Sequence, residues 1–173
     1  MKKRIFCFVI LVSAIVAAHA QKVDRSFFKA GLQVSMPIGD AGDISNFGLG
    51  IDLQQHYGVD KILDLGFATG FINYFGKTET ISDDFIEVEA DFPNIQYVPL
   101  AGLVRLYISK GVNFGADVGY ALGLDEISEG GFYYRPTLSL GMSDTSAVEF
   151  SYTGISDDAV DWSSVNLSLV FLF

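Results

Sequence analysis

Apolar residues recur at every second position over long stretches of this chain, with small or polar residues between them. The clearest example is the final segment, 162–173, in which apolar residues occupy the odd positions from Val165 to Phe173. Side chains of a β-strand point alternately to its two faces. The segment is therefore predicted to be a strand with one fully apolar face, and the chain is expected to close its fold on Phe173.

The same alternation predicts eight strands in the chain: 27–37, 46–57, 63–76, 95–108, 111–124, 131–142, 147–154 and 162–173. A strand needs only ~9–11 residues to cross a bilayer, whereas a membrane helix needs ~20 apolar residues. An even number of antiparallel strands can close into a barrel with both chain ends on one side. The predicted fold is an all-β, eight-stranded antiparallel transmembrane β-barrel with up-and-down meander order.

The connections between the predicted strands alternate in length, which supports this topology. Long connections span 38–45, 77–94, 125–130 and 155–161, and tight turns lie at 58–62, 109–110 and 143–146. Outer-membrane barrels combine long extracellular loops with short periplasmic turns. An N-terminus on the periplasmic side places every long connection outside the cell.

The N-terminal segment has the organisation of a secretory signal. Lys2, Lys3 and Arg4 precede an apolar run from Ile5 to Ala18, and small residues frame a cleavage site near Ala20. The predicted organisation is a signal peptide at 1–20 and a barrel domain at 21–173. The sole cysteine, Cys7, falls within the signal peptide, so the remaining chain has no disulfide to stabilise it.

Net charge is concentrated on one side of the predicted barrel. Residues 21–173 carry 8 basic and 21 acidic residues, and the four long connections account for the whole excess of acid. The rest of residues 21–173 balances seven basic against seven acidic residues. The acidic extracellular residues that we single out are Asp83, Asp84, Glu87, Glu89, Asp91, Asp125, Glu126, Glu129, Asp157, Asp158 and Asp161.

A second set of ionisable residues has the parity of the barrel interior. These residues are Lys29, Asp52, Asp64, Arg105, Asp117, Arg135 and Glu149, with His56 on the same face. The interior of an eight-stranded barrel is just wide enough for side chains to fill it. Buried charges persist when they are paired, so we expect a lumen charge network, with Arg105 and Arg135 facing Asp52, Asp117 or Glu149.

The sequence leaves two other hypotheses for this interior. The charges could line a narrow passive channel for ions or small solutes. A lipid-directed barrel enzyme would pair His56 with an inward serine (Ser35, Ser139 or Ser151), but its histidine should face the lipid. The sequence favours no catalytic residue.

The segment Tyr97–Ile108 (YVPLAGLVRLYI) resembles the "IPLLLKY"-type strand of porin-family outer-membrane barrels. With the signal peptide, the glycine-rich strand at 111–124 and the terminal Phe173, residues 21–173 resemble an OmpA/OmpX-type barrel. Arg105 stands where lysine is common, which keeps the charge. The resemblance implies an outer-membrane location in a Gram-negative-type bacterium, without the peptidoglycan-binding domain of full OmpA proteins, and does not establish transport.

The long connection 77–94 contains its own alternation, DFIEVEADF at 84–92. It predicts either an extended hairpin with an edge open to an extracellular protein partner or an acidic flexible loop. The acidic connections lack the ligand pattern of an EF-hand, so diffuse attraction of divalent cations is expected and no metal site or cofactor is predicted. Nucleic acid is not an expected partner. The predicted role is structural or surface-interacting, in contact with outer-membrane lipid.

Overall fold

The computed structural model describes residues 25–83, 86–125, 128–157 and 161–173. The predicted signal peptide and its cleavage site lie outside these residues. The eight strands of the main sheet are β1 (Ser26–Ile38), β2 (Ser45–Asp60), β3 (Leu63–Gly76), β6 (Ile95–Ser109), β7 (Val112–Gly123), β8 (Gly130–Ser143), β9 (Ser146–Asp157) and β10 (Trp162–Leu172).

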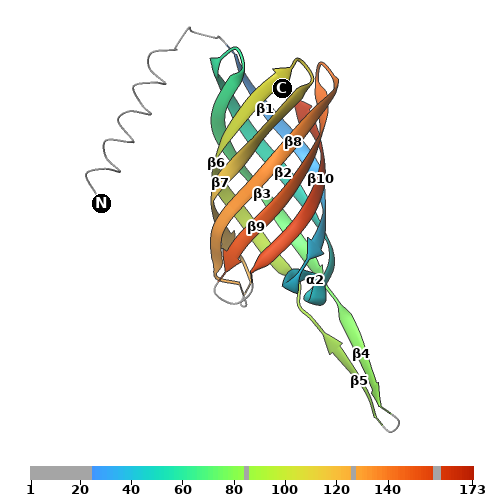
Figure 1. Cartoon of the computed structure of the whole chain (residues 1–173). Coiled ribbons are helices and arrows are strands. Elements are labelled where there is room, and N and C mark those ends of the chain that lie inside the picture. Colours follow the sequence, from blue (N-terminus) through green and yellow to red (C-terminus); the bar gives the residue numbers. More distant parts are fainter. Residues whose placement is uncertain (1–24, 84–85, 126–127, 158–160) are drawn as a thin grey trace, which may run out of the picture.

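These strands form a closed antiparallel barrel in the order β1-β10-β9-β8-β7-β6-β3-β2 (Figure 1). The seam is the pairing of β1 with β10, from Lys29 opposite Leu172 to Ile38 opposite Ser163. Phe173 completes the seam, because its N–H donates to Phe28 O at 2.8 Å and its carbonyl accepts from Phe28 N at 3.1 Å. The predicted eight-stranded meander barrel is confirmed.

Strand alternation separates the two faces of the barrel wall. Leu32 and Phe67 are each 68% exposed on the outside, whereas Gln33 is 2% exposed on the inside. Large apolar side chains such as Val118, Leu138 and Leu167 continue this exposed outer band. An apolar exterior around a polar interior is the pattern of a membrane barrel and the reverse of a water-soluble one.

The two ends of the barrel differ in construction. One end, which we call the turn rim, carries the tight turns 61–62, 110–111 and 144–145 and the chain end Phe173. The opposite end, the loop rim, carries the other connections (Figure 1). Each turn is shorter than, or shifted slightly from, its predicted span, because β2 and the neighbouring strands continue their pairing to the last residues.

A short helix, α2 (Asp40–Ile44), connects β1 to β2 at the loop rim. The strand pattern did not predict it. Its first turn carries Asp40 and Asp43, and acidic residues stabilise the N-terminal end of a helix. Ala41 is fully buried, so the helix packs inward and helps to cover this end of the barrel.

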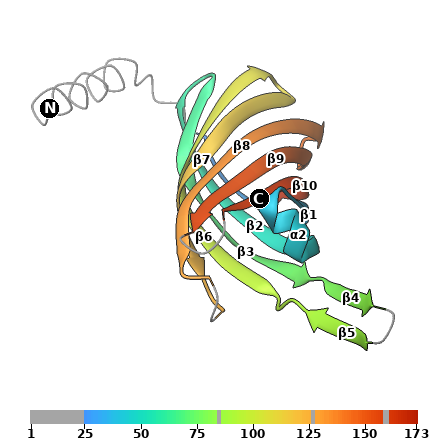
Figure 2. The ribbon, with the colours of Figure 1, turned by 60° about the horizontal axis from the view of Figure 1, so that its bottom comes forward.

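The connection between β3 and β6 forms a second, two-stranded sheet of β4 (Thr78–Asp83) and β5 (Ile86–Asp91). This hairpin projects beyond the loop rim (Figures 1 and 2). Backbone hydrogen bonds close its base and join it to α2: Phe92 N donates to Lys77 O at 2.8 Å, and Lys77 N donates to Ile44 O at 2.9 Å. Of the two predictions for this connection, the structure has the hairpin. No helix among the described residues has the length and apolar character needed to cross a membrane.

Candidate functional site

The centre of the lumen is held by two arginines that share one carboxylate. Arg135 on β8 donates to both oxygens of Asp52 on β2, at 2.9 and 3.0 Å, and its Nε donates to Asp117 Oδ2 at 2.8 Å. Arg105 on β6 donates to the other oxygen of Asp117 at 2.5 Å. All four residues are at most 3% exposed. Pairing with two hydrogen bonds suits a confined site, because the planar guanidinium matches the carboxylate.

A second pair lies beside this cluster and is joined to it by a glutamine. Lys29 Nζ on β1 donates to Glu149 Oε1 on β9 at 2.7 Å, and the two strands are separated only by β10. Gln54 Nε2 donates to Glu149 Oε2 and to Asp52 Oδ2, each at 2.9 Å. Gln54 thereby connects the lysine pair to the arginine cluster in one hydrogen-bonded network.

The remaining predicted lumen residue, Asp64, lies nearer the turn rim and has a different set of partners. Arg25 forms an ion pair with it, and Arg25 Nε donates to Asp64 Oδ1 at 3.0 Å. Tyr107 donates to Asp64 Oδ2 at 2.8 Å, and the Arg25 guanidinium lies 4.9 Å from the Tyr107 ring centroid. The structure therefore brings the seven predicted residues into two groups, which lie at different depths.

The strand pattern did not predict Arg25 as a lumen residue, although the sequence contains a signal for it. The seven predicted lumen residues comprise three cations and four carboxylates, which leaves one carboxylate without a partner. Arg25 has the same parity as Lys29 and immediately precedes β1. Extending the alternation by one step places it inside the turn rim, next to Asp64.

An aromatic layer closes the lumen towards the loop rim. Tyr74, Tyr97 and Trp162 are at most 2% exposed, and the rings of Tyr74 and Trp162 lie 4.7 Å apart. Tyr97 packs against both rings, with centroids 6.4 and 6.2 Å away. Tyr133, Ile155 and Ala41 of α2 belong to the same buried cluster. Above the charge network, the interior is therefore filled by apolar and aromatic side chains.

His56 lies inside the barrel, away from lipid. Its ring stacks on Phe27 at 4.6 Å, its Nε2 contacts Gln54 Oε1 at 3.0 Å, and its Nδ1 is 3.7 Å from Asp64. Two of the three candidate nucleophilic serines are hydrogen-bonded to side chains other than His56: Ser35 accepts from Gln33, and Ser151 accepts from Asn166. Ser139 Oγ is unpaired among the described residues.

Some of the predicted acidic residues lie in the part of the chain that the structure describes, and others lie outside it. Asp125 organises its own connection, because it accepts from Ser128 N at 2.8 Å and from Gln96 N at 2.9 Å. Asp91 accepts from Thr78 across the base of the hairpin at 2.7 Å, and Asp161 accepts from Ser156 at 3.2 Å. Glu129 is exposed. Asp83, Glu87 and Glu89 lie in β4 and β5, Asp157 ends β9, and Asp84, Glu126 and Asp158 lie outside the described residues.

Grouped ligands for a metal ion are absent from the part of the chain that the structure describes: no three His, Cys, Asp or Glu side chains converge there. The strongest concentration of titratable groups is the lumen network, and its carboxylates are already engaged by arginine, lysine, glutamine or tyrosine. The interior thus has the chemistry of a paired structural network.

Comparison with solved structures identifies the class of fold. Ail, the attachment invasion locus protein of Yersinia pestis, superimposes with a TM-score of 0.56 and 13% identity, covering 86% of this chain and 97% of Ail. The structure of Ail in a phospholipid bilayer nanodisc gives a TM-score of 0.58 and 14% identity, covering 86% of this chain and 100% of that chain. The complex of Ail with the heparin analogue sucrose octasulfate gives a TM-score of 0.50 and 15% identity, covering 86% of this chain and 97% of that chain. No family model matches the sequence, and no curated protein matches it. The chain has the fold of a small outer-membrane β-barrel.

Proposed function

We propose that this protein is an integral outer-membrane barrel that presents a surface for interaction outside the cell. The apolar outer band would contact lipid, the turn rim would face the periplasm, and the loop rim would face the exterior. Residues 1–20 would be removed on export, which N-terminal sequencing of the membrane-inserted protein can test. The segregation of acidic residues to the loop rim supports this orientation.

The observation that carries the proposal is the filled lumen. Paired charges occupy its centre and an aromatic layer occupies the end towards the loop rim. A barrel that is filled at two successive levels is poorly suited to passing solutes. Its activity is then expected on the surfaces outside the membrane, and the most extended of these is the β4–β5 hairpin.

The hairpin has the properties of a docking edge for a polypeptide. It is a two-stranded sheet, and isolated two-stranded sheets are only marginally stable in water. Glu87, Glu89 and Asp91 occupy alternate positions of β5, and alternate residues of a strand share one face of the sheet. An added partner strand with Lys or Arg at alternate positions would place opposite charges across the pairing.

The charge of the loop rim also indicates which ligands to exclude. Ail is described in complex with a polysulfated heparin analogue. The connections on the loop rim of this chain are strongly acidic, so a polyanion would be repelled. We propose a basic protein segment as the partner, with divalent cations attracted diffusely to the same surface.

The test measures binding of a synthetic strand-forming peptide with alternating Lys residues to cells that display the protein. Glu87→Gln combined with Glu89→Gln should reduce binding by about tenfold. The matched control, Asp157→Asn with Asp161→Asn, removes the same charge from another connection and should reduce binding much less. Equal loss in both double variants would show general charge attraction, and binding of sucrose octasulfate instead of the peptide would reject the proposal.

A further inference from the structure

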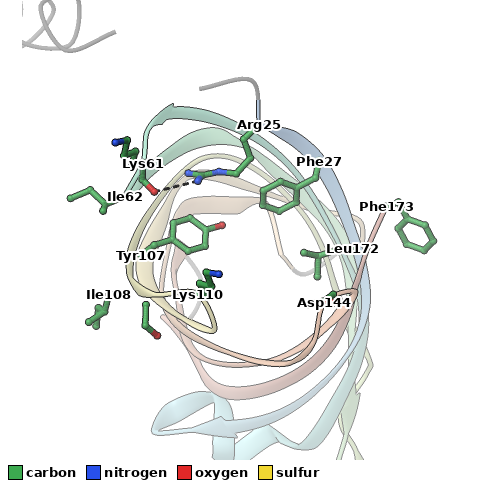
Figure 3. Close-up of a pocket in the computed structure, with 11 residues that line it drawn as sticks. Arg25, Phe27, Lys61, Ile62, Tyr107, Ile108, Lys110, Asp144, Leu172 and Phe173 are labelled. Carbon is green, nitrogen blue, oxygen red and sulfur yellow. Dashed lines mark hydrogen bonds between the residues drawn. The ribbon is translucent and has the colours of Figure 1, made fainter. Parts of the chain in front are cut away.

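The turn rim contains two adjoining cavities that the proposed surface role does not use. The outer cavity, of about 650 Å³, is lined by Arg25, Phe27, Lys61 and neighbouring residues (Figure 3). The inner cavity, of about 300 Å³, extends to Lys29. They share Tyr107, Lys110, Asp144 and Leu172. Together they have the size of a ligand pocket.

The inner cavity has buried polar atoms without partners. Asn113 is 6% exposed and Ser139 is 1% exposed, and both line this cavity. Among the described residues, Asn113 Oδ1 accepts no hydrogen bond, and the Ser139 hydroxyl neither donates nor accepts one. Buried polar atoms in folded proteins nearly always have a partner, so these two atoms point to an occupant of the cavity.

The charges around the inner cavity favour an anion. Lys29 and Lys110 line it, and Asp144 is the single carboxylate residue among its described lining residues. Lys29 Nζ makes one hydrogen bond to Glu149, whereas an ammonium group has three donors. The Ser139 hydroxyl has no partner among the described residues and can donate into this space. Ser143 and Ser146 also line the cavity, with their hydroxyls hydrogen-bonded to each other at 2.7 Å. A phosphate group would find both charge and hydrogen-bond donors here.

The outer cavity supplies an apolar path from this polar space over the edge of the barrel. Phe27 and Leu172 line its lumen side, while Ile62 and Ile108 are 57% and 68% exposed and belong to the lipid-facing side. Figure 3 shows Ile62 and Ile108 pointing outward from the ring of strands and Phe27 pointing inward. An occupant with a polar head and an apolar chain can therefore contact both sides of the wall.

We infer that the turn rim binds one phospholipid of the adjoining leaflet. Its phosphate lies in the inner cavity with Lys29, Lys110 and Ser139, and an acyl chain passes over Ile62 and Ile108 into the membrane. This site is separate from the loop rim and does not depend on the hairpin having a partner. Asp144 opposes the phosphate and limits the strength of binding.

Native mass spectrometry of the detergent-purified protein tests the site, with dioleoyl phosphatidic acid as the probe and dioleoylglycerol as the phosphate-free control. The wild type should retain the phosphatidic acid and not the diacylglycerol. Lys110→Gln and Ser139→Ala should each weaken retention by about tenfold, and Asp144→Asn should strengthen it. Lys61→Gln is the matched control, because it removes a charge from the same rim but lines only the outer cavity.

The variants change an exposed residue or truncate a hydroxyl, and their folding is checked by the shift in gel mobility on heating. Equal losses in Lys61→Gln and Lys110→Gln would overturn the site in favour of general rim charge. Equal retention of the diacylglycerol would show that the apolar chain alone drives binding. Displacement of the lipid by an equal concentration of inorganic phosphate would show a free-anion site and overturn the assignment to lipid.

Discussion

Arg135 and Asp52 form a two-pronged ion pair across the interior of the barrel, with N–O distances of 2.9 and 3.0 Å. They come from β8 and β2, which are not neighbours in the barrel order. The pair therefore bridges the lumen instead of lying along its wall. Because the pair both stabilises the fold and occupies the lumen, a change that removes it should affect stability and closure together.

Arg135→Ala should lower the free energy of unfolding by about 3–5 kcal/mol, because it leaves the buried carboxylates of Asp52 and Asp117 without their shared cation. Urea or thermal unfolding in detergent or lipid vesicles measures this change. Planar-bilayer recordings should show little current through the wild type and an added leak through the variant. Large steady wild-type currents, with the variant equally stable, would reject the closed lumen and favour the narrow channel.

Val118→Arg should destabilise the barrel by roughly 2–4 kcal/mol, the cost of a cation facing lipid near the bilayer midplane. Val118 lies in the middle of β7 and is 50% exposed on the outer face. Ile62→Arg at the turn rim should cost only about 0–1 kcal/mol, because the cost falls towards the interface. Folding titrations into lipid vesicles compare the two, and equal costs would contradict the proposed placement of the membrane.

Gly115→Ala should destabilise the barrel, by roughly 1–3 kcal/mol. A Cβ at Gly115 would lie 1.9 Å from Val104 O and 2.9 Å from Arg105 Cδ, so the backbone of β6 and the Arg105 side chain both need this space. Gly102→Ala is the control, since its Cβ would approach nothing closer than 4.0 Å. Unfolding midpoints of the two variants should differ clearly, and a stable Gly115→Ala would contradict the packing described around Arg105.

The fold was predictable because strand parity is repeated in every segment. Each strand has one face in lipid and one in a narrow interior, so the sequence alternates strictly, as Val112 to Gly123 illustrates. The helix α2 was not predictable in this way, because five residues carry no periodic signal. The turn boundaries shifted by one to three residues, since pairing between strands continues as far as the backbone allows.

The interior was only partly predictable from sequence. Parity selects which residues face inward, but the partner of each charge depends on the register and stagger of strands far apart in sequence. Lys29 meets Glu149, which lies 120 residues away. The aromatic layer of Tyr74, Tyr97 and Trp162 has inward parity on three strands, yet its common depth follows only from strand tilt. The cavities at the turn rim depend on side-chain packing and had no sequence signal.

The orientation of the barrel can be tested with two proteases, one that cuts at glutamate and one that cuts at lysine, because these residues lie at opposite rims. The glutamates Glu79, Glu87, Glu89, Glu126 and Glu129 lie in connections of the loop rim, whereas Glu149 is buried in the lumen. Lys61 and Lys110 lie in the turns of the opposite rim. On intact cells, a glutamate-specific protease should cut the protein within residues 78–91, while trypsin should leave the 61–62 and 110–111 turns intact. After the outer membrane is opened, trypsin should gain access to both turns. Tryptic cleavage after Lys110 on intact cells, with the hairpin protected, would invert the proposed orientation.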